Sequence, residues 1–227
     1  FDNSVATPHQ LLSEIETLFN ENSKLLGQDF DTVVIIHQNN LSTLVPTPFF
    51  NESELKTYLD YNIKTLENDF IAYDSLNQID ANNVYIPYVN INNFFFQHFG
   101  EFEYKHHSTV LIEKLITLSK NNTQKQFFVN VTNQNFDIVV IEDSKLLFYN
   151  SFSFNTKEDF IYYILFTAEQ LKMNPEELFL FFSGDIEEVS EIYHITYQYI
   201  RNIEFLNTNN SLFEQEEHIS AHSNFII

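Results

Sequence analysis

Cysteine is absent from this sequence, and glycine and arginine are scarce. The 227 residues include only three glycines, Gly27, Gly100 and Gly184, and a single arginine, Arg201. Without cysteine the chain has no disulfide, thiolate zinc site, iron–sulfur cluster or cysteine nucleophile. So few glycines also count against phosphate-binding loops, because those loops need the backbone to come close to the ligand.

Positive charge is also in short supply. Lys and Arg number 11 against 32 Asp and Glu, which gives a formal net charge of −21. We therefore expect no nucleic acid partner, because binding a phosphate backbone requires lysine and arginine. No stretch resembles a signal peptide or a transmembrane helix, so we expect a cytoplasmic protein with no direct membrane insertion. Because the sequence starts at Phe1 and not at Met, we also expect it to be processed or to lack an N-terminal piece.

The residues that are present favour a globular α/β protein. Hydrophobic residues make up 44% and aromatic residues 16% of the chain, and the length suits one domain or two small ones. In the first half, Pro8 suits the start of a helix and Gly27 its end. Further periodicity predicts strands at 30–38, 41–48, 69–76, 83–88 and 101–105, and helices at 52–63, 90–99 and 108–119.

A polar stretch at 120–125 is the best domain boundary in the sequence. It predicts a first domain at 1–124, a second at 125–206, and an acidic, weakly ordered tail at 207–227. In the second domain an antiparallel meander should precede alternating helices and strands. The expected strands are 126–131, 136–142, 145–154, 178–182 and 202–206, and the expected helices are 156–173 and 186–199.

This order of elements predicts mixed sheets flanked by helices, as in the ribonuclease-H-like unit of actin-like proteins. The first half also repeats part of the second. Residues 30–60 are similar to residues 136–164, and both should run strand, hairpin, strand, short loop and helix. We therefore expect a duplicated architecture, with chance similarity in a chain rich in Asn, Phe and Ile as the alternative.

The order and the local motifs resemble the actin-like ATPase superfamily, and in particular its PilM and FtsA group. Leu44-Val45-Pro46 with the helix after Glu52 is similar to the small inserted subdomain of that group. Residues 69–76 and 83–100 resemble the strands and helix that follow it. The whole chain resembles a Bacteroidetes family of unknown function with this fold. The resemblance implies that the first β-hairpins of the first half lie upstream of Phe1.

The resemblance also indicates where a nucleotide would bind, and there the expected motifs are degraded. Actin-like ATPases hold phosphates with Asp-x-Gly turns, and the second such turn falls after the strand at 126–131. Asn130 stands in place of the aspartate and Thr132 in place of the glycine. The adenosine-side motif usually has two glycines, of which Gly184 alone remains, followed by Asp185. These four residues are the candidates for a vestigial nucleotide cleft.

Metal sites and hydrolytic chemistry have weaker support. His106 and His107, with Glu101 and Glu103 nearby, could suggest a metal site, but we expect them to be solvent-facing loop histidines. His218 and His222 could share a helical face in the tail. Asp185 follows an apolar strand at a turn, where catalytic acids can occur, but Gly-Asp is also ordinary turn chemistry. A ribonuclease-H-like nuclease needs clustered carboxylates, whereas Asp137 and Glu142 should lie on opposite faces of one strand.

The aromatic runs and the degraded motifs together suggest a role in protein binding. Phe94-Phe95-Phe96 and Phe181-Phe182 are either core residues or part of a docking patch. Three consecutive phenylalanines of a helix cannot all face one core, so Phe96 should be exposed or contact the other half. We expect a non-catalytic actin-like scaffold or adaptor with protein partners, no catalytic residue, no metal and no cofactor. The alternative is an ATP-binding protein related to PilM.

Overall fold

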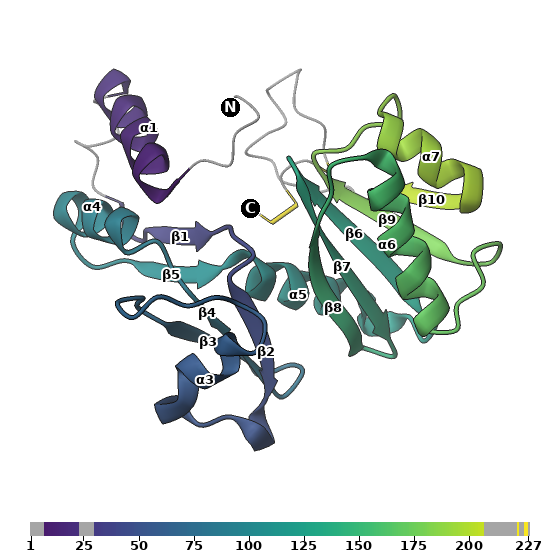
Figure 1. Ribbon diagram of the computed structural model, residues 1–227, viewed down its shortest axis with the longest axis horizontal. Coiled ribbons are helices and arrows are strands. Elements are labelled where there is room, and N and C mark those ends of the chain that lie inside the picture. Colours follow the sequence, from purple (N-terminus) through teal and green to yellow (C-terminus); the bar gives the residue numbers. More distant parts are fainter. Residues whose placement is uncertain (1–6, 23–29, 207–221, 223–224, 227) are drawn as a thin grey trace. The chain divides into compact units, whose positions relative to one another are not determined.

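The computed structural model describes residues 7–22, 30–206, 222 and 225–226 of the chain (Figure 1). The chain divides into two compact units, residues 1–110 and 111–227. This division falls inside helix α5, His107–Leu118, which precedes the polar stretch at 120–125.

Unit 1 alternates short strands with helices, close to the predicted order. The predicted strands at 30–38 and 69–76 are shorter in the structure, and the helix at 52–63 is divided between a 3-10 turn and a short α-helix. The elements are α1 Pro8–Glu21, β1 Val34–His37, β2 Ser42–Pro46, η1 Thr47–Phe49, η2 Glu52–Glu54, α3 Leu55–Asp60, β3 Ala72–Leu76, β4 Ala81–Tyr85, α4 Val89–Phe99 and β5 Glu103–His106.

Strands β1 and β2 belong to different sheets of unit 1. Strand β1 pairs in parallel with β5, whereas β2 pairs with β4 in a three-stranded antiparallel sheet of order β2-β4-β3. The hairpin predicted between residues 30–38 and 41–48 is therefore wrong. Asn39 reaches over from the turn between the two strands: its amide nitrogen donates to the carbonyl of Ile86 at 3.0 Å. The chain thus passes to the second sheet instead of folding back on β1.

The three-stranded sheet and helix α3 form a small subdomain with its own apolar core. Val45 of β2, Leu59 of α3 and Val84 of β4 are buried in this core, together with Ile86. Phe50 stacks near the Tyr58 ring and packs on Tyr73, with centroid distances of 6.1 and 4.8 Å. The Leu-Val-Pro segment and helix α3 thus share one apolar core.

Helix α1 packs on helix α4 through phenylalanine side chains. Phe19 makes edge contacts with Phe94, Phe95 and Phe99, at centroid distances of 5.5 to 5.9 Å. Phe96 points away and is 63% exposed, as its position in the run predicts. Thr7 caps α1, and the helix ends at Glu21. The predicted end at Gly27 lies outside the described residues.

Unit 2 contains the strands that carry the candidate site. Its five-stranded sheet has the order β10-β9-β6-β7-β8: β6, β7 and β8 form the predicted antiparallel meander, and β9 and β10 add in parallel. The elements after α5 are η3 Ser119–Asn121, β6 Gln126–Thr132, β7 Asn135–Glu142, β8 Lys145–Ser153, α6 Lys157–Gln170, β9 Phe179–Gly184, α7 Glu191–Tyr199 and β10 Asn202–Phe205.

Helices α6 and α7 cover one face of this sheet (Figure 1). Phe160 of α6 is fully buried and packs on Phe136 of β7 and Phe182 of β9, at centroid distances of 4.5 and 6.3 Å. A capping box of Thr156 and Asp159 begins α6, which starts within one residue of the predicted position. Tyr162, two residues after Phe160, faces outward and is 58% exposed.

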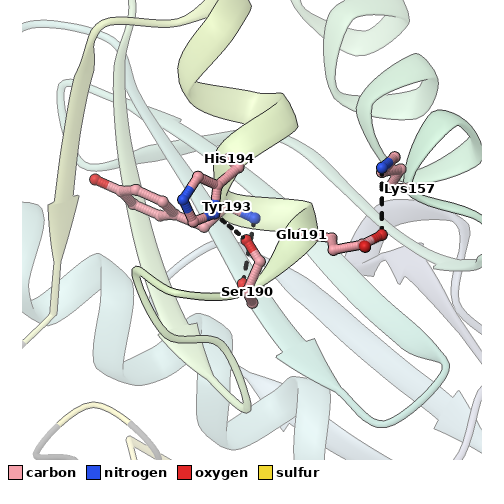
Figure 2. Close-up of polar contacts among 5 residues, drawn as sticks. All are labelled: Lys157, Ser190, Glu191, Tyr193 and His194. Atoms are coloured by element: carbon pink, nitrogen blue, oxygen red, sulfur yellow. Dashed lines mark hydrogen bonds and ion pairs between the residues drawn. The ribbon is translucent and has the colours of Figure 1, made fainter.

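Helix α7 begins five residues later than the sequence predicts, at Glu191 instead of residue 186. Ser190 is the N-cap: its hydroxyl accepts from the N–H of Tyr193 at 3.3 Å (Figure 2). The same hydroxyl donates to the carbonyl of Glu187 at 2.7 Å. Periodicity alone did not distinguish the turn before Ser190 from the helix. Lys157 of α6 and Glu191 of α7 form an exposed ion pair at 3.3 Å (Figure 2), which contributes about 0–1 kcal/mol.

Candidate functional site

The structure brings the four predicted site residues together where strands β6 and β9 end. The two strands are parallel, with Asn130 opposite Ser183 and Val131 opposite Gly184. Thr132 is the last residue of β6, and Asp185 directly follows β9. Since the carboxyl ends of parallel strands meet at one edge of a sheet, this is where a ligand of an open α/β sheet would bind.

Asn130 belongs to a row of buried polar side chains that crosses four strands. The hydroxyl of Ser183 on β9 donates to Asn130 Oδ1 at 3.0 Å. Asn130 Nδ2 in turn donates to Asp137 Oδ2 on β7 at 3.5 Å, and the hydroxyl of Tyr149 on β8 donates to Asp137 Oδ1 at 3.2 Å. Asn130, Asp137 and Ser183 are each 2 to 3% exposed. Both polar atoms of the Asn130 amide are therefore engaged within the sheet.

Thr132 helps to close the hairpin between β6 and β7. Its side-chain hydroxyl donates to the carbonyl of Asn135 at 3.2 Å, and the two residues are opposite one another in the register. The positive-φ residues of the described chain include neither Asn133 nor Gln134, the two residues of this turn. The turn therefore has no need of the glycine that an Asp-x-Gly motif supplies.

Gly184 is required by the packing of the sheet itself. Its φ is +83°, and a Cβ at this position would lie 2.0 Å from the carbonyl oxygen of Val131 on β6. The glycine that the sequence suggested as a remnant of a nucleotide motif thus has a structural reason to be present. Asp185 is exposed, and its backbone N–H donates to the same Val131 carbonyl at 2.8 Å.

The chain itself occupies the backbone donor at Gly184. The N–H of Gly184 donates to the carbonyl oxygen of His222 at 2.8 Å. The imidazole of His222 binds as well: Nε2 lies 2.5 Å from the carbonyl oxygen of Ile186, which can only accept, so Nε2 carries the proton. The ring also packs on Phe205 of β10, with centroids 4.5 Å apart.

Phe225 and Ile226 bind to unit 2 through Lys114 of helix α5. Lys114 Nζ donates to the carbonyls of Phe225 at 3.0 Å and of Ile226 at 2.9 Å. The ammonium also lies 6.0 Å from the centre of the Phe225 ring, and burial lowers the pKa of Lys114. Phe225 is only 4% exposed. The polar pattern of the tail did not predict this burial.

In unit 1, His106 and His107 are buried, so the prediction of solvent-facing loop histidines is wrong. Their exposed fractions are 0 and 3%. The reason is that β5 continues into α5 without a loop, with His106 as the last strand residue and His107 as the first helical one. Glu101 and Glu103, the carboxylates considered with them, are both exposed.

The hydrogen bonds of His106 fit a neutral imidazole. Nδ1 lies 2.7 Å from Ser108 Oγ and accepts from the Ser108 backbone N–H at 3.3 Å. Nε2 lies 3.1 Å from the carbonyl oxygen of Asn39 and therefore carries the proton. Burial, followed by the neighbouring His107, lowers the pKa of His106 well below its usual value.

Asp74 joins this histidine to the adjacent sheet. Its Oδ2 accepts from the backbone N–H of His106 at 2.9 Å and from Thr109 Oγ1 at 2.7 Å. Its Oδ1 accepts from the Tyr85 hydroxyl at 3.0 Å, and burial raises the pKa of Tyr85. No sequence motif indicates this cluster, because Asp74, Tyr85 and His106 are distant from one another in the chain.

The metal sites considered from the sequence are not formed in the described part of the chain. There, no group of three or more His, Asp or Glu side chains could hold a metal ion. His218 lies outside the described residues, and His222 uses Nε2 to donate to a carbonyl. Asp137 is buried on β7, whereas Glu142 ends that strand and is half-buried.

The sheet order and the two-unit organisation define an actin-like ATPase fold, which confirms the predicted fold class. A solved structure from Bacteroides thetaiotaomicron, described as a protein with actin-like ATPase fold and unknown function, is 24% identical to the chain. The match covers 91% of this chain and 78% of that one, with a TM-score of 0.78. The PilM–PilN type IV pilus biogenesis complex matches at 12% identity over 91% and 77% of the two chains, with a TM-score of 0.52.

The chain belongs to the DUF3822 family, which is described as a protein of unknown function. The family model matches residues 1–203. The predicted resemblance to a Bacteroidetes family of unknown function, and more distantly to PilM, is therefore confirmed. No curated protein matches the chain significantly. None of the helices in the described ranges combines the length and apolarity needed to cross a bilayer.

Proposed function

We propose that the chain is a non-catalytic actin-like scaffold or adaptor that acts by binding a protein partner in the cytoplasm. The observation that supports this most is the hydrogen bond from Gly184 N–H to the carbonyl of His222. The donor at the remaining glycine of the adenosine-side motif is used by the chain itself.

The phosphate-side residues support the same function. Asn130 binds Ser183 and Asp137 within the sheet, and Thr132 closes its own hairpin. An amide holds the water shell of Mg²⁺ less well than a carboxylate does. The hairpin turn after Thr132 has no positive φ, so it does not present the backbone N–H groups that a phosphate nest requires.

Surface charge indicates what kind of partner suits the scaffold. A net charge of −21 disfavours association with acidic molecules and favours partners with basic surfaces. One structural neighbour, PilM, forms a complex with the protein PilN, which is consistent with a protein-binding role for the fold.

Thermal unfolding with and without Mg-ATP tests this proposal. A nucleotide present at 100 times its dissociation constant would add about 2.7 kcal/mol to the free energy of unfolding. We expect the melting temperature with millimolar Mg-ATP to equal that with Mg²⁺ alone. A saturable upward shift would instead favour the alternative, an ATP-binding protein related to PilM, and would call for hydrolysis assays.

A further inference from the structure

The contacts of His222, Phe225 and Ile226 have the character of a bound peptide. His222 binds the end of β9 at two points, through its carbonyl oxygen to Gly184 and through Nε2 to Ile186. Three residues later, Phe225 is buried and its carbonyl accepts from Lys114. Backbone atoms make most of these polar contacts, and two ring-bearing side chains supply the apolar ones.

The site to which they bind continues the sheet. Leu206, after β10, donates its N–H to the carbonyl of Phe182 at 2.8 Å, which extends the parallel β9–β10 pairing. Two residues after Phe182, the N–H of Gly184 lies beyond the end of the β9–β10 pairing, and it donates to His222 instead of to β10. A segment from elsewhere in the chain can thus bind a backbone donor that β10 leaves open, at a sheet edge of the kind that protein segments use as a docking site.

We propose that the end of β9 and β10 is a peptide-binding site, which in this chain is occupied by its own His222, Phe225 and Ile226. The partner is a protein segment of the same chemistry, with an imidazole followed three residues later by a phenylalanine. The inference rests on the proposed function and deepens it, since it names the class of partner that the scaffold binds. Binding of the partner requires release of the chain's own segment. The internal segment therefore lowers the apparent affinity of the chain for its partner.

Covalent attachment makes the internal segment a strong competitor. Residues 207–221 join it to β10, and a tether of this kind gives an effective concentration on the order of millimolar. A free peptide at micromolar concentration therefore cannot displace it from the wild-type chain. Loss of the His222 and Phe225 side chains weakens the internal segment and leaves Gly184, Ile186 and Lys114 in place.

The test uses a fluorescein-labelled peptide with the sequence of residues 218–227, HISAHSNFII, and the full-length chain. The double variant His222→Ala/Phe225→Ala should bind the peptide saturably in fluorescence anisotropy, and the wild type should bind at least about tenfold more weakly because its own segment competes. A peptide carrying the same two alanines should not bind either chain. Lys114→Gln in the double variant should weaken binding about fivefold or more, because it removes a charged donor to two carbonyls.

Several results would overturn the proposal. Equal binding of native and alanine peptides, or no binding to a double variant whose circular dichroism is that of the folded protein, would show that the segment is not a detachable ligand. Phe225→Ala alone replaces the double variant if the latter does not fold. A wild-type dimer in light scattering that the double variant loses would assign the segment to a second copy. Failure here is separate from failure of the proposed function, which the Mg-ATP experiment measures.

Discussion

The backbone N–H of Gly184 donates a 2.8 Å hydrogen bond to the carbonyl oxygen of His222. The two residues are 38 positions apart in the sequence, and the bond lies at the edge of the sheet where an open α/β sheet would bind a ligand. Gly184 therefore has two roles in this chain. It lets β9 pass close to Val131, and it binds the chain's own segment.

The first prediction concerns the packing role of Gly184. A Cβ at this position meets the Val131 carbonyl at 2.0 Å, and the backbone is also left-handed. Gly184→Ala should therefore lower the free energy of unfolding by roughly 2–5 kcal/mol, as measured by chemical denaturation.

Gly100 provides a matched control for that experiment. Its φ is +75°, but a Cβ there would have no atom within 4 Å. Gly100→Ala should cost only the conformational strain, roughly 1–3 kcal/mol, and less than Gly184→Ala. Equal losses in the two variants would contradict the steric argument for Gly184.

The second prediction concerns Asn130, which stands where actin-like ATPases have an aspartate. Asn130→Asp would place a second carboxylate beside the buried Asp137 and remove the amide donor between them. We expect a loss of about 2–4 kcal/mol at pH 7. The exposed Asn150 of β8 offers the control, since Asn150→Asp should change stability by less than about 0.5 kcal/mol.

The stability deficit of Asn130→Asp should depend on pH, and its direction follows from the two neighbouring carboxylates. Two adjacent carboxylates raise a carboxyl pKa in the folded state above its unfolded value of about 3.9. The variant is then least penalised below that pH, and its deficit relative to wild type grows as the pH rises toward neutrality. A deficit that stays constant from pH 4 to 7, or that Mg²⁺ abolishes, would contradict the prediction.

The third prediction concerns His106, the buried histidine at the end of β5. Burial holds the folded-state pKa of His106 below its unfolded value of about 6.5. The folded state therefore binds fewer protons, so stability is complete above that pH and is lost as the pH falls through the window below it. His106→Gln should show a shallower loss of stability between pH 7 and 5 than the wild type.

The exposed His9 of α1 serves as the control for the pH experiment. His9→Gln should leave the wild-type slope of unfolding free energy against pH unchanged. If His106→Gln also retains the full wild-type slope, His106 does not supply the pH dependence. His37 is also buried and has a lowered pKa, so some of the slope should remain in His106→Gln.

The fourth prediction compares two aromatic residues of α6 that lie two positions apart. Phe160 is fully buried in the aromatic cluster, and Tyr162 is 58% exposed. Phe160→Ala should cost about 3–5 kcal/mol, and Tyr162→Ala should cost less than about 0.5 kcal/mol, by denaturant unfolding. Similar losses would mean that α6 is rotated about its axis relative to the sheet.

Much of unit 2 could be predicted from the sequence because its signals are local. Short polar turns separate three strands rich in apolar residues, and a Thr-Asp capping box begins α6. The start of α7 was missed because Ile186 continues the apolar period, while the capping geometry of Ser190 decides the boundary.

The unit 1 polar cluster and the bound segment could not be predicted, because they depend on contacts between distant residues. Asp74 and His106 are 32 positions apart and are joined by a side chain and a backbone N–H. Phe225 lies in a polar stretch without periodicity, and Lys114, which donates to its carbonyl, lies more than a hundred residues earlier. Likewise, β1 and β2 looked like a hairpin until their true partners, β5 and β4, were known.

The scarcity of glycine allows one direct measurement. A sample labelled with ¹⁵N-glycine has three glycine residues, Gly27, Gly100 and Gly184, so each amide resonance can be assigned with one substitution. We predict that the Gly184 amide exchanges slowly with solvent and does not move when Mg-ATP is added to millimolar concentration. A Gly184 resonance that exchanges rapidly and shifts saturably with Mg-ATP would show that the site is open and binds nucleotide, which would contradict the self-occupied site.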